Sequence, residues 1–321
     1  MCDRARRRGR PLFICESAPP MELTGDALPA GALPHVSVIV PHYNDLASLD
    51  RCLSALQAQT YAPDRFDVIV ADNMSTVGAD AVKQTIAGRA RIVSVAERGA
   101  GPARNGGVAV ARGQILAFTD SDCIPAPEWL AEGVAALKRS DFVGGGMRVL
   151  VGDEDHVTGA EAFELVFAFD NQAYVERKGF TVTANLFCPA ALFAQVGGFR
   201  VGVSEDLEWS HRARDAGFKI GYAPAALVAH PARRDWKELS AKWRRLNAET
   251  FGIVAARPQG RGRWLARSLL LPLSAVAHTP RVLTSPRLRS PRQKLRAMAM
   301  LYRLRFWRAF DAVGLLARAE R

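Results

Sequence analysis

The chain has 321 residues, of which 49% are hydrophobic and 23% charged, proportions typical of a folded protein rather than a disordered one. This length allows one large domain or two smaller ones. The five cysteines are odd in number, widely spaced and without a C-x-x-C pair, which argues against a disulfide framework or a zinc site and suits a reducing cytoplasm.

The net charge of +11 is distributed unevenly along the chain. Residues 1–34 hold 5 Lys and Arg against 4 Asp and Glu, residues 35–230 hold 17 against 23, and residues 231–321 hold 21 against 5. The basic character therefore belongs to the last quarter of the chain, whereas the centre is mildly acidic.

No secretory signal is evident, because the basic run at 4–10 is followed by only a short apolar stretch. Met21 opens a stretch that leads directly into the first predicted strand, so we hypothesise that translation starts there rather than at Met1. We expect residues 1–34 to be a disordered extension. Ser268–Pro280 is uncharged but contains a proline and is too short to span a bilayer, and we predict no transmembrane helix.

Strands and helices alternate from residue 36 to about 140. The apolar and helical periodicities predict strands at 36–40, 66–72, 91–97 and 114–122, and helices at 46–59, 79–88, 102–113 and 126–140. This alternation predicts an α/β fold with βαβ units and a mainly parallel sheet, Rossmann-like in its first half.

The second half of the chain is predicted to add further strands and helices before a basic end. A strand at 141–151 contains three glycines, which permit close approach of another backbone. The remaining predictions are a helix at 157–177, a strand and short helix within 180–199, a helix at 205–217 with Ser204 as its N-cap, and a strand pair at 219–230.

Two aspartates, Asp120 and Asp122, follow the predicted strand at 114–122. Ligands of open α/β sheets bind beyond the carboxyl ends of strands. Two carboxylates so close repel each other unless a cation lies between them, and oxygen ligands suit Mg²⁺ or Mn²⁺. The D-S-D triplet alone also occurs in surface turns. Its position after a buried strand favours a metal site that binds a nucleotide diphosphate.

Eight short motifs occur in a fixed order between residues 36 and 230. They are VSVIVPHYND, VIVADNMST, GPARNGG, FTDSD, EWL, VGGGM, the block VGGF with SEDLEWSHRARDAGFKIGY, and ALVAHP. In order and spacing they resemble the inverting family 2 glycosyltransferases of the GT-A fold. The resemblance implies a nucleotide-sugar donor, Mn²⁺ or Mg²⁺ as a cofactor, and sugar transfer with inversion at the anomeric carbon.

The resemblance also implies roles for individual residues. In the donor site, Pro41, Tyr43 and Asp72 would line the nucleobase pocket, Asp120 would contact the ribose or metal-bound water, and Asp122 would bind the metal with His230 close by. Asp206 matches the general base. The chain departs from the family pattern after Asp72, where Met74 replaces the usual glycine and no acid follows Thr76, so the resemblance does not fix which nucleotide binds.

The chemistry agrees with these roles, because an inverting transfer needs one base, a neutralised diphosphate leaving group and no protein nucleophile. Glu205 and Asp206 also stand where acids stabilise a helix start. We take Asp206 as the base and Glu205 as structural or acceptor-binding. Trp209 either stacks on an acceptor sugar or belongs to the core.

Two further features have competing interpretations. Arg104 and Asn105 either orient the diphosphate or begin a helix, and we favour the structural role. The glycine spacing in GAGPARNGG resembles a dinucleotide motif, but the first strand lacks the glycine turn of a dinucleotide binder, which argues against an oxidoreductase.

The basic region 235–321 is predicted to be helical, amphipathic and rich in aromatic residues. Such helices commonly lie in the interface of an anionic membrane. The alternatives are a helical subdomain packed on the catalytic core, or a nucleic-acid surface, for which no recognised motif is present and which we do not expect. We expect a cytoplasmic protein on the inner face of the plasma membrane, and expect truncation near Arg257 to leave a soluble, active domain.

The sequence thus predicts a GT-A catalytic domain over 35–234 followed by the basic region. The favoured function is glycosyl transfer to a glycan or lipid-linked acceptor in cell-surface polysaccharide or glycolipid biosynthesis. The alternative is a non-catalytic accessory protein that binds a membrane surface and retains a degenerate nucleotide fold. Asp120, Asp122 and Asp206 together favour the enzyme.

Overall fold

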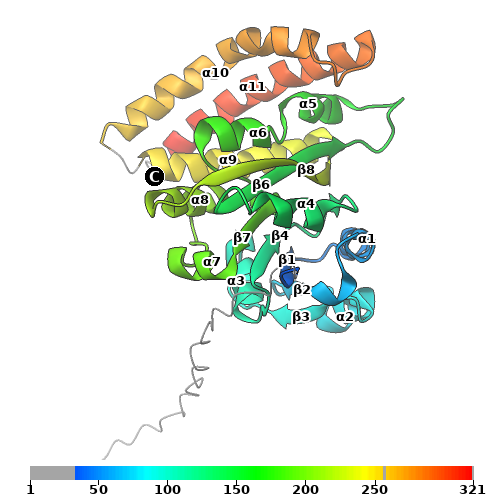
Figure 1. Ribbon diagram of the computed structural model, residues 1–321. Helices are drawn as coiled ribbons and strands as arrows, with labels where there is room; N and C mark the ends of the chain where they lie inside the picture. Colours follow the sequence, from blue (N-terminus) through cyan, green and yellow to red (C-terminus); the bar gives the residue numbers. More distant parts are fainter. Residues whose placement is uncertain (1–32, 256–257, 320–321) are drawn as a thin grey trace, which may run out of the picture. The chain divides into compact units, whose positions relative to one another are not determined.

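The computed structural model describes residues 33–255 and 258–319. The expectations for residues 1–32, including the translation start, lie outside the described residues. Within those described, eight strands form one sheet in the order β3-β2-β1-β4-β7-β6-β8-β5 (Figure 1). The strands are β1 Val36–His42, β2 Phe66–Asp72, β3 Arg91–Ser94, β4 Ile115–Phe118, β5 Ile124–Pro125, β6 Phe142–Leu150, β7 Leu186–Pro189 and β8 Ile220–Pro231.

The first four strands pair in parallel, and β8 is parallel to β6. β7 runs antiparallel to both β4 and β6, and the short β5 runs antiparallel to β8. The mixed, mainly parallel sheet that the sequence predicts is therefore confirmed. Because β1, β2 and β4 are parallel, their carboxyl ends meet at one edge, where α/β sheets bind ligands.

The helices connect these strands and extend the chain beyond them. They are α1 Leu46–Gln57, α2 Ala79–Ile86, α3 Ala100–Ala109, α4 Trp129–Ala136, α5 Gly159–Phe167, α6 Asn171–Ala173, α7 Ala190–Val196, α8 Glu205–Asp215, α9 Trp236–Ala255, α10 Gly260–Leu283 and α11 Pro291–Ala319. Shorter turns are η1 Pro63–Arg65, η2 Tyr174–Lys178 and η3 Thr183–Asn185, of which η2 is a turn of π-helix.

Side chains of the central strands alternate between two cores, one on each face of the sheet. Val38 and Val40 of β1 pack with α1, α2 and α4, whereas Ile39 packs with residues of α7 and α8. Strand periodicity sends successive side chains to opposite faces, so a strand buried on both sides is apolar throughout. This double burial fixes the strand ends that carry the site.

Three local predictions need correction. The helix expected at 157–177 is broken, because α5 ends at Phe167 and Phe169 adopts a left-handed backbone with φ of 51° before α6 begins. The pair expected at 219–230 is one strand, β8, with an irregular register opposite Gly145 and Gly146. Ser204 precedes α8 as expected, but its side chain makes no capping hydrogen bond.

The glycines of β6 confirm the close approach that the sequence predicts. A Cβ at Gly145 would lie 2.3 Å from the carbonyl oxygen of Ala226 and 2.3 Å from the side-chain amide of Asn185. Asn185 Nδ2 donates to the Gly146 and Ala226 carbonyls at 2.8 Å each. Any larger residue at 145 would push β8 away from β6.

The basic region forms the helices α9, α10 and α11, which pack on one another and on α5 (Figure 1). A third core is built from buried residues of these four helices, including Phe163, Leu239, Ala275 and Leu301. The region therefore packs on the rest of the chain. Truncation near Arg257 would remove two of the four helices that form this core, so we no longer expect it to leave a stable domain.

Within residues 33–255 and 258–319, no helix combines the length and the apolar character needed to cross a bilayer.

Candidate active site

A cleft of about 600 Å³ lies at the carboxyl ends of β1 and β4. It is lined by the strand ends, the loop after β4, the first turn of α8, the end of β8 and part of α9. The sequence-predicted site residues that line it are Pro41, Tyr43, Asp120, Asp122, Glu205, Asp206 and His230. Seven residues from distant parts of the sequence therefore meet in one cleft.

Asp122 and His230 face each other across this cleft. The carbonyl oxygen of Pro231 lies 2.7 Å from His230 Nδ1, and since a carbonyl only accepts, Nδ1 must donate. His230 Nε2 lies 3.2 Å from Asp122 Oδ2. Two lone pairs would repel at this distance, so the contact is favourable only with a proton or a cation between them. A backbone carbonyl that fixes the tautomer in this way is typical of metal-binding histidines.

The surroundings of Asp122 favour its ionised form. Burial raises the pKa of Asp122, but the hydrogen bond with His230 and the positive charges of His230 and Arg233 outweigh burial and lower it. Among the residues that the structure describes, Asp122, Cys123 and His230 form a group with ligand atoms within 4.8 Å of one another. Burial raises the pKa of the Cys123 thiol, which keeps it protonated and leaves the carboxylate and imidazole as the better ligands.

Arg104 bridges two acidic side chains that line the cleft, Asp120 and Glu205. Its side chain is 3% exposed, and its two terminal nitrogens donate to Asp120 Oδ1 at 2.5 Å and to Glu205 Oε1 at 2.7 Å. A buried guanidinium held between two carboxylates fixes both of them. The structural role favoured for Arg104 stays a prediction, and the structure adds that the residue lines the cleft and is bonded to Asp120.

Asp206 lies in the first turn of α8, half-buried, beside the η3 turn. Its Oδ1 accepts hydrogen bonds from the Thr183 amide at 3.0 Å and the Thr183 hydroxyl at 2.7 Å. Burial raises the pKa of Asp206, and the Arg104 charge and the two Thr183 hydrogen bonds only partly oppose this rise. A fixed carboxylate with a raised pKa suits a general base.

Of the three residues predicted to bind a nucleobase, Pro41 and Tyr43 line the cleft and Asp72 does not. Tyr43 is 56% exposed and can present its ring to a ligand. Asp72 is buried beside the cleft rather than in its wall, and its carboxylate accepts from the Ser75 hydroxyl at 2.5 Å and the Ser75 amide at 3.3 Å. Met74, at the position where the family pattern has glycine, has a left-handed φ of 63°, a conformation that glycine adopts more easily.

Trp209 requires a correction. Its side chain is fully buried, packs among Phe142, Phe193 and Phe199, and donates from Nε1 to the Gly197 carbonyl at 3.0 Å. A ring with no exposed surface cannot stack on an acceptor. Trp209 belongs to the core, where it supports α8. Glu205 stays a candidate for the acceptor side, with one carboxylate oxygen bound by Arg104.

Among the cleft-lining residues that sequence reasoning did not single out are Phe169, Arg233 and Lys242. The ring of Phe169 lies 4.6 Å from that of His230, and the Lys242 ammonium lies 5.5 Å from the Phe169 ring. Lys242 belongs to α9, whose basic residues were predicted to face a membrane. The one signal available was the nearness of Arg233 to His230 in sequence.

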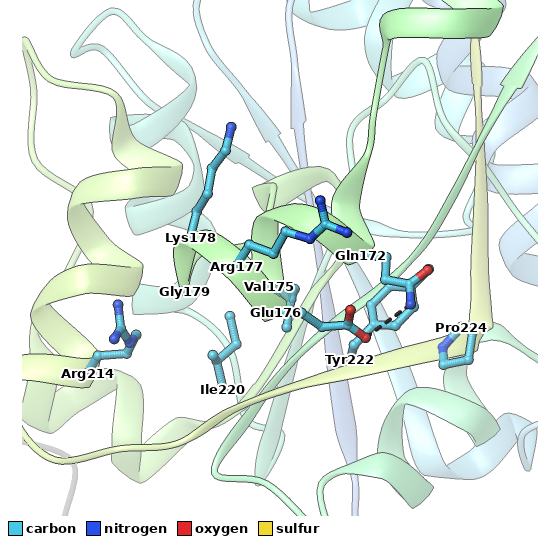
Figure 2. A pocket seen from close by; sticks show the side chains of 10 residues that line it. All are labelled: Gln172, Val175, Glu176, Arg177, Lys178, Gly179, Arg214, Ile220, Tyr222 and Pro224. Atoms are coloured by element: carbon cyan, nitrogen blue, oxygen red, sulfur yellow. Dashed lines mark hydrogen bonds between the residues drawn. The ribbon is translucent and has the colours of Figure 1, made fainter. Parts of the chain in front are cut away.

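A second, wider depression of about 790 Å³ lies between η2, the end of α8 and the start of β8 (Figure 2). Gln172 Nε2 donates to Glu176 Oε1 at 3.1 Å in its wall. Arg177, Lys178 and Arg214 line it, but in Figure 2 their charged groups lie apart and do not converge. It contains none of the predicted site residues, so the cleft is the candidate active site.

The strand order and the cleft at the strand ends define the class, the GT-A fold of glycosyltransferases. A solved structure of GalNAc-T7 with UDP, GalNAc and Mn²⁺ has a similar fold, with a TM-score of 0.50 and 18% identity over 64% of this chain and 45% of that one. The model of glycosyl transferase family 2 matches residues 37–205, more than half of the chain. The chain therefore belongs to glycosyltransferase family 2, as its motifs indicate.

Curated relatives agree with this membership. The glycosyltransferase AglE of Haloferax volcanii is 31% identical over 209 residues, 63% of this chain and 68% of that protein. Validoxylamine A glucosyltransferase of Streptomyces hygroscopicus subsp. limoneus is 30% identical over 255 residues, 66% of this chain and 56% of that protein. The chain thus spans about two thirds of one relative and little more than half of the other.

Proposed function

We propose that this glycosyltransferase moves a sugar from a nucleotide-diphosphate donor to a glycan or lipid-linked acceptor, with inversion at the anomeric carbon. One observation carries the proposal: a single cleft on a family 2 fold contains the Asp122–His230 pair, the Arg104-bound Asp120 and the half-buried Asp206. The route to a cell-surface polysaccharide or glycolipid is part of this proposal.

Each residue has a role that follows from its surroundings. Tyr43 and Pro41 would bind the nucleobase, and Asp120, fixed by Arg104, would bind the ribose. Asp206 would accept the proton of the attacking acceptor hydroxyl, held in place by Thr183. Because a raised pKa makes a carboxylate a stronger base, burial at Asp206 favours this step once the group is ionised.

The residues present fit a divalent cation. Asp122 supplies a carboxylate oxygen, and His230 has a tautomer fixed by Pro231, with Nε2 directed at that carboxylate. Oxygen and imidazole ligands suit Mn²⁺, and carboxylate also suits Mg²⁺. When bound, the ion would neutralise charge on the departing diphosphate.

We further propose that α10 and α11 rest on an anionic membrane surface that supplies a lipid-linked acceptor. Large apolar side chains are exposed along one face of α10, three, four or seven residues apart, at Leu265, Leu269, Leu273, Val276 and Leu283. A similar set on α11 is Leu295, Phe306, Phe310 and Val313. Exposed apolar positions on basic helices are typical of interfacial helices.

The test of glycosyl transfer is release of nucleoside diphosphate from a panel of nucleotide sugars with Mn²⁺. We expect release from at least one donor by the full chain, its loss on adding EDTA, and its loss in Asp122→Ala. Asp64→Ala, at an exposed acid in η1, is the matched control and should be as active as the wild type. Full activity in EDTA would refute the metal site, and no release from any donor would favour the accessory-protein alternative.

A further inference from the structure

Two cations enter the cleft from the segment that begins at the end of β8. Arg233 follows β8, and Lys242 lies one turn and a half into α9. Both are held by Glu164 of α5, whose carboxylate is almost fully buried. Lys242 Nζ lies 2.8 Å from Glu164 Oε1, Arg233 NH1 lies 3.3 Å from the same oxygen, and the Arg233 amide donates to Glu164 Oε2 at 2.9 Å.

The charges in this cluster do not balance. In the part of the chain that the structure describes, Arg233 and Lys242 both contact Glu164, so one carboxylate faces two cations. Burial lowers the pKa of Lys242, the charges of Arg233 and Arg245 lower it further, and Glu164 only partly opposes them. A single cation would neutralise Glu164, so the second is available to bind an anion.

The cluster lies close to the Asp122–His230 pair. The Lys242 ammonium is over the face of Phe169, and that ring packs on His230. The charge of Arg233 also contributes to lowering the pKa of Asp122. Phe169 has a left-handed backbone at the break between α5 and α6, and its ring contacts both His230 and Lys242. An anion bound by the cations would therefore lie beside the candidate metal site.

We propose that Arg233 and Lys242 form a phosphate-binding subsite on the α9 side of the cleft, an inference that rests on the proposed function. The phosphate group belongs either to the donor diphosphate or to a lipid-phosphate acceptor, and both present the same anionic oxygens. In either case the C-terminal helices contribute directly to substrate binding. Glu164 is then a positioning residue that holds both cations towards the cleft.

The first experiment measures the binding of nucleoside diphosphates and the matching nucleosides to the full chain by calorimetry with Mn²⁺. If the donor supplies the phosphate, Lys242→Met and Arg233→Gln should each weaken diphosphate binding by roughly 10- to 100-fold, the strength of a charge-assisted hydrogen bond. Nucleoside binding should not change, because it lacks the phosphates. Lys242→Arg keeps the charge and should restore most of the affinity.

Two substitutions of exposed neighbours are matched controls. Lys237→Met makes the same change on the same helix, and Arg234→Gln makes the same change one residue along the chain, both at exposed positions that do not line the cleft. Both should bind diphosphate as the wild type does. Thermal unfolding of all variants separates a lost ligand contact from a lost fold.

The second experiment replaces the nucleotide by farnesyl phosphate, with farnesol as the control without phosphate. If the acceptor supplies the phosphate, Lys242→Met and Arg233→Gln should weaken farnesyl phosphate binding by the same factor and leave nucleoside diphosphate binding unchanged. If both variants fold and neither ligand is affected, the subsite proposal is wrong.

The two experiments also separate this proposal from the one on which it rests. If the wild type binds no nucleoside diphosphate, the donor part of the proposed function fails, while farnesyl phosphate still decides whether the cations bind phosphate. If the wild type binds neither compound, both proposals fail. If the wild type releases diphosphate from a donor but the variants bind both phosphates normally, only the subsite is wrong.

Discussion

Asp206 is under opposing influences that a general base requires. Burial raises its pKa, whereas the Arg104 charge and the Thr183 hydrogen bonds favour the ionised form, and the Thr183 hydrogen bonds hold the carboxylate in one orientation. The same Arg104 fixes Asp120 and Glu205. One buried guanidinium thus joins the acid that follows β4 to Glu205, the chain neighbour of the candidate base.

Asp206→Asn should slow transfer by roughly 10²- to 10⁴-fold, because the amide keeps the shape but cannot take the proton. Donor affinity should stay close to that of the wild type. In the wild type the ionised carboxylate is the active form, so the rate should fall as pH decreases through the raised pKa, at a higher pH than for an ordinary aspartate. Rate–pH profiles and calorimetry measure both effects.

Asp215→Asn, an exposed acid on the same helix, is the matched control and should behave as the wild type. If Asp206→Asn instead weakens donor binding and leaves the transfer rate for each bound donor unchanged, Asp206 binds the donor and is not the general base.

The sequence best identifies site residues that are marked by their place next to a predicted strand. Asp122 follows a buried strand and His230 ends one, and the structure brings the two together at 3.2 Å. The sequence favours a structural role for Arg104 and places Lys242 in the membrane-binding region, because the contacts that bring both to the cleft are with partners about 100 and about 80 residues away. Trp209 illustrates the reverse error, since a pattern on a helix does not show which face the core covers.

At the scale of elements, the first parallel strands were predictable, whereas the single strand β8 and the break between α5 and α6 were not. Buried parallel strands are apolar on both faces, so their sequence signal is strong. The break between α5 and α6 has no proline, and its left-handed residue is Phe169, which nothing in the local sequence marks. The ring of Phe169 contacts His230 and Lys242, which are more than 60 residues away in the sequence, so a local pattern carries no sign of them.

The packing of α11 gives a prediction for stability. Leu301 is fully buried in the core shared by α5, α9, α10 and α11. Leu301→Ala should lower the free energy of unfolding by roughly 2–5 kcal/mol, through lost burial and the cavity that remains. Urea unfolding measures the change. Leu295→Ala, at a residue of the same helix that is 66% exposed, should have little effect.

Equal stabilities for the two variants would mean that α11 does not share a core with α5 in solution. Such a result would support the expectation from the sequence that truncation near Arg257 leaves a soluble, active domain.

At the scale of the whole molecule, the charge of the last quarter of the chain predicts surface binding, whereas its packing places it against the core and the cleft. Residues 231–321 hold 21 Lys and Arg against 5 Asp and Glu, which predicts an affinity for anionic surfaces. The structure adds that these helices also bury a core and that α9 contributes Lys242 to the cleft. If α10 and α11 rest on a membrane, α9 links them to the cleft, because it packs on both helices and contributes Lys242 to the cleft.

The membrane proposal predicts that the protein sediments with vesicles of phosphatidylcholine and phosphatidylglycerol, but not with phosphatidylcholine alone. Salt should release it, because ions screen exposed charges over about 10 Å at 0.1 M. Leu269→Glu and Phe310→Glu place acids at residues that are 63% and 76% exposed, and should weaken sedimentation without changing diphosphate release from a soluble donor. Val110→Glu, at an exposed residue that follows α3, is the control.

If neither variant reduces sedimentation, the apolar faces of α10 and α11 do not contact the bilayer. If the wild type ignores anionic vesicles at low salt, the basic surface has another partner, and the acceptor must reach the cleft from solution.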